Sequence, residues 1–277
     1  MIEANKHIFF KHLLDPMRLI YAIFILLLAL MTSAQCQQTA EDWFYKGVAL
    51  YDQGKYDEAI KAYDYLIQAC DDAIKLDPTI DVAKDARDAK GNALNGKGNA
   101  LCGKGNVLLR QEKYDEAINA SDDAINAFDD AFKCFDDAKD ARDVGKGIAL
   151  DGKGTALDGK GTALFAQGKY DDAIKCFDDA INASDDAFKC FDDAIKLDPN
   201  SVNAGKGKGI ALGIKGIALH NKGNALAAQG KYDEAIKAYD EAIRLDPNYA
   251  AALLNKGVDL KALGRTSEAN AAFVKAM

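Results

Sequence analysis

The sequence predicts an all-α protein, an α-solenoid of about five antiparallel helix pairs in which several helices are elongated. The first observation is a seven-residue repeat of apolar side chains through most of residues 40–277. The second is a composition of 23 glycines against 4 prolines, which is unusual for a chain rich in loops. The third is the distance from a leading tyrosine to a closing Asp-Pro pair. It is 21, 28 and 14 residues in the blocks that begin at Tyr56, Tyr170 and Tyr232.

Blocks that begin with tyrosine, such as YDEAIKA, form one heptad family. Their first, fourth and fifth places are apolar, their second place is aspartate and their sixth place is lysine or asparagine. This spacing puts the apolar side chains on one stripe of an α-helix, and each added heptad preserves the stripe with a drift of about 20°. We expect ion pairs within each helix, each contributing about 0.2–0.5 kcal/mol. The expected pairs are Asp57–Lys61, Asp129–Lys133, Asp171–Lys175, Asp185–Lys189 and Asp233–Lys237.

Blocks of the type KGNALNG form a second heptad family, which precedes the blocks that begin at Tyr114, Tyr170 and Tyr232. Alanine and leucine recur at fixed places and no proline interrupts them, so we expect these segments to be helices too. A glycine inside a helix costs about 1 kcal/mol relative to alanine. The repeated glycines therefore indicate helices whose backbones approach their neighbours closely.

Residues 1–34 have the features of an export signal. Basic residues precede an apolar run from Leu19 to Met31, and Thr32-Ser33-Ala34 supplies small residues for a signal peptidase. The run is shorter than the roughly 20 residues that span a bilayer as a helix. We expect a cleaved signal peptide, with an uncleaved signal anchor as the alternative. Either one places residues 35–277 outside the cytoplasm, secreted or anchored to a membrane only through the N-terminal segment.

The charge balance of the chain argues against a nucleic-acid partner. Asp and Glu number 43 against 35 Lys and Arg, a formal net charge of −8, whereas nucleic-acid binding requires a basic surface. Only three histidines are present, at positions 7, 12 and 220, which leaves little basis for histidine catalysis or a multi-histidine metal site.

A longer pattern is superimposed on the heptads. Its best copy is Leu219, Gly223, Leu226, Gly230, Tyr232, Ala235, Tyr239, Ala242 and Pro247, and further copies follow from Trp43, Leu101, Leu157 and Leu253. The pattern resembles the tetratricopeptide repeat (TPR) over nearly all of residues 40–277. The resemblance implies antiparallel helix pairs stacked into a right-handed superhelix with a concave binding face. The solenoid, residues 35–277, is then divided into repeats at residues 40–78, 81–141, 142–199, 203–247 and 250–277.

The sequence departs from the TPR pattern at several places. Glu112 stands where repeat two should have its turn glycine, and Thr266 replaces the tyrosine of repeat five. Residues 139–145 contain no proline, so a turn and a continuous helix both remain open there. The last repeat reaches Met277 without the separate capping helix that solenoids usually carry, and we expect it to permit self-association.

The sequence offers no motif that supports catalysis. Gly154 to Lys160 has the glycine-lysine spacing of a P-loop, but Gly161 follows where Ser or Thr is needed and no strand precedes it. The six cysteines include no C-x-x-C pair, and Cys134, Cys176 and Cys190 take heptad places that alanine and leucine fill elsewhere. We interpret them as packing residues rather than disulfides or zinc ligands. Paired aspartates without EF-hand spacing are interpreted as a solvated acidic face. These pairs are Asp122–Asp123, Asp129–Asp130, Asp178–Asp179 and Asp192–Asp193.

We therefore expect a non-enzymatic scaffold, without cofactor or metal, that binds a peptide or protein on its concave face. In TPR modules that hold peptide termini, asparagines on the first helix of each pair contact the ligand backbone. His220 stands where such modules have a lysine of a carboxylate clamp, so capture of a C-terminal carboxylate is not expected. The alternative is a self-associating or cation-dependent structural component of the cell surface. The candidate partner-binding residues are Asn99, Asn106, Thr162, His220, Asn224 and Asn255.

Overall fold

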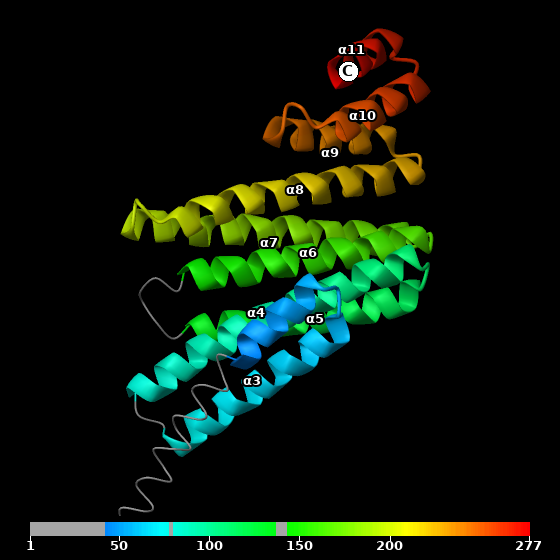
Figure 1. Ribbon diagram of the computed structural model, residues 1–277. Coiled ribbons are helices and arrows are strands. Elements are labelled where there is room, and N and C mark those ends of the chain that lie inside the picture. The colour runs from blue at the N-terminus through cyan, green and yellow to red at the C-terminus, as the bar shows by residue number, and fades with distance from the viewer. Residues whose placement is uncertain (1–41, 78–79, 137–142) are drawn as a thin grey trace, which may run out of the picture.

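The computed structural model describes residues 42–77, 80–136 and 143–277, and within these ranges the chain folds into α-helices and turns without a strand (Figure 1). The predicted all-α solenoid of five helix pairs is confirmed. The first helix of each pair is here called inner, and the second outer. The inner helices are residues 42–52, α4 (Ile80–Arg110), α6 (Asp143–Ala166), α8 (Val202–Ala228) and α10 (Ala250–Ala262). The outer helices are α3 (Tyr56–Leu76), α5 (Tyr114–Asp136), α7 (Tyr170–Leu197), α9 (Tyr232–Leu245) and α11 (Thr266–Ala276).

Each inner helix is joined to its outer helix by a tight turn in the left-handed backbone region. Four of these turns use a glycine with a φ of 72–77°, at Gly54, Gly168, Gly230 and Gly264. The fifth uses Glu112, whose φ is 59°. Glutamate thus adopts the same conformation without the freedom that glycine has there, which carries a steric cost.

The extra heptads lengthen the helices at the end opposite to these turns, which lie together on the right of Figure 1. An outer helix and the inner helix that follows it have matched lengths at three junctions. They are 23 and 24 residues for α5 and α6, 28 and 27 for α7 and α8, and 14 and 13 for α9 and α10. At these three junctions, the outer helix of one repeat and the inner helix of the next are therefore lengthened by about the same number of residues. At the first junction, α3 has 21 residues and α4 has 31.

The glycines of the inner helices make room for aromatic rings of the outer helices, which refines the expected close approach of backbones. A β-carbon on each of the glycines named below would lie under 3.0 Å from a ring atom. Four rings lie between two such glycines, one from the inner helix of the same repeat and one from the next. The rings are Tyr63 between Gly47 and Gly96, Phe128 between Gly98 and Gly152, Phe135 between Gly91 and Gly145, and Phe191 between Gly147 and Gly207. All four are buried. Each glycine pair is called a glycine socket below.

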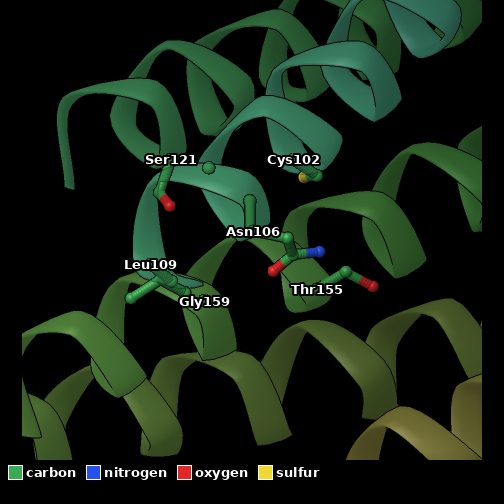
Figure 2. A pocket seen from close by; sticks show the side chains of 8 residues that line it. Cys102, Asn106, Leu109, Ser121, Thr155 and Gly159 are labelled. Carbon is green, nitrogen blue, oxygen red and sulfur yellow. The ribbon is translucent and has the colours of Figure 1, made fainter. Parts of the chain in front are cut away.

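Two outer-helix heptads have serine at the place of the ring. Ser121 faces Gly105 and Gly159, which leaves a cavity of about 10 Å³ that is also lined by Cys102, Asn106 and Thr155 (Figure 2). Ser184 faces Gly154 and is fully buried, because Ile214 of α8 reaches within 3.3 Å of the β-carbon position of Gly154. The same serine therefore leaves a void in one repeat and is covered in the next.

The predicted ion pairs of Asp57, Asp129 and Asp185 with a lysine four residues later are wrong. Lys133 and Lys189 pair with Asp130 and Asp186, three residues earlier in the same helix. Asp57, Asp129 and Asp185 accept hydrogen bonds from Lys104, Lys153 and Lys215 of the following inner helix instead. The lysine that opens each inner heptad reaches the aspartate at place two of the preceding outer helix, because the two helices run antiparallel in a seven-residue register. Nine such pairs have N–O distances of 2.5–2.7 Å. They are Lys90–Asp71, Lys97–Asp64, Lys104–Asp57, Lys153–Asp129, Lys160–Asp122, Lys208–Asp192, Lys215–Asp185, Lys222–Asp178 and Lys256–Asp240.

Helix α5 ends at Asp136, and helix α6 begins at Asp143. The two helices pack against each other, so they are separate helices rather than one continuous helix. The predicted export signal at residues 1–34 and Cys36 lie outside the described residues. No helix in the described ranges is both long and apolar enough to cross a membrane.

Candidate functional site

The candidate site lies on the inner layer of the solenoid. The backbones of inner helices α4, α6, α8 and α10 approach one another closely in sequence, whereas the backbones of the described outer helices do not approach one another in this way. The inner helices therefore form the tighter layer and the concave side. Place three of their heptads faces outward from this layer, and it includes Asn99 and Asn106 of α4, Thr162 of α6 and Asn224 of α8.

Three of the predicted residues come together between α8 and α10. Asn255 Nδ2 donates a hydrogen bond of 2.7 Å to Asn224 Oδ1 and lies 3.0 Å from His220 Nε2. Asn224 Oδ1 accepts a second hydrogen bond, of 2.9 Å, from the Tyr239 hydroxyl of α9. Tyr239 is fully buried, so its hydroxyl group holds the Asn224 side chain in place from the core side. We call His220, Asn224, Asn255 and Tyr239 the asparagine cluster.

The protonation state of His220 follows from its surroundings. Burial lowers the pKa of His220, since the charged imidazolium loses hydration in the packed layer. A neutral imidazole accepts the Asn255 hydrogen bond at Nε2, so the proton of the ring resides on Nδ1. The ring also lies 5.2 Å, centroid to centroid, from that of Tyr249. The site is therefore uncharged at this point near neutral pH.

The other three predicted residues lie apart from the asparagine cluster. Asn99 and Asn106 are exposed on α4, and Thr162 is half-buried on α6. Asn106 borders the cavity beside Ser121, where Figure 2 shows it close to Thr155 of α6. The structure thus supplies one bonded cluster on α8 and α10 and a separate polar line on α4 and α6.

Sequence reasoning missed a second polar contact on the same layer. Asn221 Nδ2 of α8 donates a hydrogen bond of 2.9 Å to Asp158 of α6. Burial raises the pKa of Asp158 to about 6, and the Asn221 hydrogen bond opposes that rise. These two residues take places six and seven of their heptads. The sequence does not indicate that place six of α6 lies opposite place seven of α8, because this follows only from how the two helices pack.

An apolar line on the same face was also missed. Ile148, Ile210 and Ile217 hold place three of their heptads on α6 and α8, and Val258 holds it on α10. All four side chains are exposed. Place three therefore holds asparagine on α4, isoleucine at the extended ends of α6 and α8, and valine on α10.

The remaining motifs of the sequence have structural roles. The P-loop-like segment from Gly154 to Lys160 lies inside α6, and Lys160 donates to Asp122 of α5. Asp122, Asp129, Asp178 and Asp192 each accept from a lysine of the next inner helix. In the described ranges, no group of three His, Cys, Asp or Glu side chains is placed to hold a metal ion, and no disulfide joins two of the five described cysteines.

Comparison with known families decides the identity of the fold. Family models described as tetratricopeptide repeat match residues 40–73 and 155–186, and one described as TPR repeat matches residues 223–276. The chain is a tetratricopeptide repeat protein. The matched ranges fall on the first, third and last two helix pairs of this TPR protein.

Solved structures give more distant likenesses to the TPR protein. A crystal structure of MamA is 20% identical, with a TM-score of 0.40, over 83% of this chain and 91% of that chain. YrrB, described as a TPR protein with an unusual peptide-binding site, is 18% identical with a TM-score of 0.38, over 84% and 82%. The designed helical repeat protein DHR81 is 16% identical with a TM-score of 0.47, over 80% and 91%. No curated protein matches the sequence significantly. As a TPR protein, the chain is a scaffold for protein–protein interaction.

Proposed function

We propose that this protein binds an extended peptide segment of a protein partner on the concave face formed by α4, α6, α8 and α10. The hydrogen bonds of Asn224 and Asn255 carry the proposal. Asn224 Oδ1 already accepts from two donors, and Asn255 Nδ2 already contacts two acceptors. The Asn224 amide nitrogen and the Asn255 carbonyl oxygen have no hydrogen bond within the described residues. One donor thus lies beside one acceptor, as a peptide unit requires.

The chemistry of the face selects the main chain of a peptide rather than a carboxylate. The lysines that open the inner heptads are held by aspartates of the outer helices, so they do not form a clamp on this face. The neutral His220 ring orients Asn255 without adding charge. Exposed apolar side chains, such as Ile217 of α8 and Val258 of α10, flank the asparagine cluster. A peptide with apolar side chains on one edge would therefore bury them as its backbone pairs with the asparagines.

The test uses peptides selected on the full-length protein from a random display library. Asn255→Ala and Asn224→Ala are each expected to weaken the selected peptides at least tenfold, which corresponds to about 1.4 kcal/mol. Asn119→Ala is the matched control, because Asn119 is an exposed asparagine on the outer helix α5, away from the concave face. Selected peptides that bind both cluster variants as tightly as the wild type would refute this site.

We also propose that the protein works outside the cytoplasm, exported through residues 1–34. The support is the basic, apolar and small-residue order of that segment. Fractionation of cells that express the full chain is expected to place it in an extracytoplasmic or membrane fraction. N-terminal sequencing then distinguishes a cleaved signal from an anchor, and recovery in the cytoplasm would contradict the proposal.

A further inference from the structure

The N-terminal half of α8 has no outer helix on the face that its C-terminal half presents to α9. Helix α8 has 27 residues, whereas α9 has 14. In Figure 1, α8 extends to the left well beyond α9 and α10. The face in question consists of places two and five of the inner heptads, the places that hold glycine and leucine in α4 and α6. Its exposed members are Val202, Gly205, Gly209 and Leu212, and it ends at Gly216, which is buried. We call this stretch, from Val202 to Gly216, the α8 ledge.

The exposure of the leucines shows that the ledge continues an interface of the fold. Leu219 and Leu226 take place five under α9, and they are 3% and 5% exposed. Leu212 takes the same place one heptad earlier and is 38% exposed. Val202, at the far end, is 66% exposed. The apolar positions of α8 therefore continue beyond the part that α9 covers, where their side chains are exposed.

The glycines of the ledge match the glycines that hold rings elsewhere in the molecule. Gly147 of α6 takes place two, and a β-carbon there would lie 2.6 Å from the Phe191 ring of α7. Gly209 takes the equivalent place of α8, and nothing lies within 4 Å of its β-carbon position. Gly216 is buried, but nothing lies within 4 Å of its β-carbon position, whereas Ser184 Oγ lies 3.2 Å from the β-carbon position of the equivalent Gly154. The ring of Phe191 against Gly147 of α6 thus shows what kind of side chain would fit against Gly209 of α8.

The charged residues of α8 indicate what kind of helix could bind to the ledge. The helix carries four lysines and no acidic residue. Lys208, Lys215 and Lys222 pair with aspartates of α7, but Lys206 has no carboxylate partner within the described part of the chain. The long outer helices α3, α5 and α7, which cover residues 42–52, α4 and α6, are all rich in aspartate. The ledge therefore fits an acidic helix better than a basic one.

We propose that the α8 ledge binds an acidic amphipathic helix of a partner protein, which places an aromatic side chain against Gly209 and continues the line of α9. The nearest template is the second half of α7, residues 184–197, which covers the equivalent part of α6. The ledge spans about 21 Å of helix, enough for two heptads. This surface is separate from the concave face, because the ledge lies at places two and five of α8, whereas the concave residues lie at place three.

The test uses the full-length protein and a fluorescent peptide with the sequence of residues 184–197, with Ala for Cys190 and a lactam bridge on its solvent side. The bridge is needed because an isolated helix of this length is marginal in water, and circular dichroism verifies that it is formed. Binding is expected in fluorescence anisotropy. Gly209→Leu is expected to weaken it at least tenfold, because leucine fills the space for the ring. That variant replaces glycine within a helix and meets open space, so its melting temperature should not fall.

Three controls decide the outcome. A peptide with Ala for its Phe191 equivalent is expected to lose at least tenfold in affinity. Ile210→Ala, on the concave face of the same helix, is expected to leave binding unchanged, whereas an effect equal to that of Gly209→Leu would overturn the proposal. Absence of binding to the wild-type protein would overturn it too. A wild-type dimer in light scattering that Gly209→Leu converts to a monomer would assign the ledge to a second copy and overturn the proposed partner.

Discussion

Ser121 and Ser184 occupy the same place of the outer heptad, yet their surroundings differ. Around Ser121, both facing inner helices carry glycine, and a cavity of about 10 Å³ remains. Around Ser184, one inner helix carries Gly154 while the other supplies Ile214, and the serine is fully buried. The sum of the facing side chains, rather than the outer residue alone, determines whether a socket is filled.

The replacement of glycine by Ile214 also changes the polar contacts of α6. Asn221 of α8 donates to Asp158 of α6. One heptad earlier along both helices, the register brings Ile214 to the place opposite Asp151. Asp151 is 7% exposed, and its Oδ1 has no hydrogen-bond partner. The residue that fills the Ser184 socket therefore leaves a buried carboxyl group without a donor.

The largest expected effect is the loss of a ring from a filled socket. Phe128→Ala empties the space between Gly98 and Gly152, and neither glycine has a side chain that could move into it. We expect a loss of about 3–5 kcal/mol in the free energy of unfolding, measured by urea denaturation. Ser121→Ala, one heptad away, is the control and should cost less than about 1 kcal/mol. Similar losses for both variants would show that the sockets do not act as separate packing units.

The next prediction is that phenylalanine changes the stability in opposite directions at the two serines. Ser184→Phe forces a ring against Ile214 and is expected to cost about 1–3 kcal/mol. Ser121→Phe places the ring between Gly105 and Gly159, as in the neighbouring sockets, and is expected to add about 1 kcal/mol of stability. Melting temperatures of the two variants test this comparison. A stabilising Ser184→Phe would contradict the idea that Ile214 closes that socket.

The third effect depends on pH. Burial raises the pKa of Asp151 from an ordinary value of 3.8 to about 7. Well below pH 3.8 the carboxyl group is neutral in both the folded and unfolded states. Between about pH 4 and pH 7 the unfolded state loses this proton while the folded state keeps it, so the stability falls progressively as the pH rises to about 7. Asp151→Asn is therefore expected to add about 1–3 kcal/mol at pH 8 and little at pH 4. An equal change at both pH values, in urea denaturation, would exclude ionisation as the cause.

The smallest effect concerns the tight turns. Glu112→Gly removes the steric cost of a left-handed glutamate and is expected to stabilise the protein by about 1 kcal/mol. Gly168→Ala, at the equivalent turn of the next repeat, should destabilise it by a similar amount. The two melting temperatures are compared directly, and a shift in the same direction for both would contradict the role assigned to φ.

Most of the fold could be predicted because the heptads are local. The Tyr-to-Asp-Pro spacings predicted the elongated outer helices, and the TPR pattern placed Glu112 at the turn that glycine forms in the other repeats. The ion pairs could not be predicted, because Lys61 lies four residues from Asp57 in the chain, while Lys104 reaches the same carboxylate only after the next helix packs. The role of the glycines was hidden for the same reason, since Gly98 contacts a ring 30 residues away.

The candidate site was predicted in part. His220, Asn224 and Asn255 do meet, because the TPR pattern places them on facing inner helices. The contribution of Tyr239 was missed, since this residue counts in the pattern only as an apolar packing position, and its hydroxyl group reaches Asn224 through the core. Asp158 and Asn221 carry no local signal, because these two residues are 63 positions apart in the chain.

The matched helix lengths have a consequence for how this molecule can change during evolution. The C-terminal end of an outer helix and the N-terminal start of the next inner helix are neighbours in the chain, joined by a short loop. A single contiguous insertion or deletion around that loop can therefore alter both helices by the same number of heptads. Sockets and lysine–aspartate pairs keep their partners, as the difference between α7–α8 and α9–α10 illustrates. The gene can thus widen one part of the solenoid in a single event, without adding a repeat.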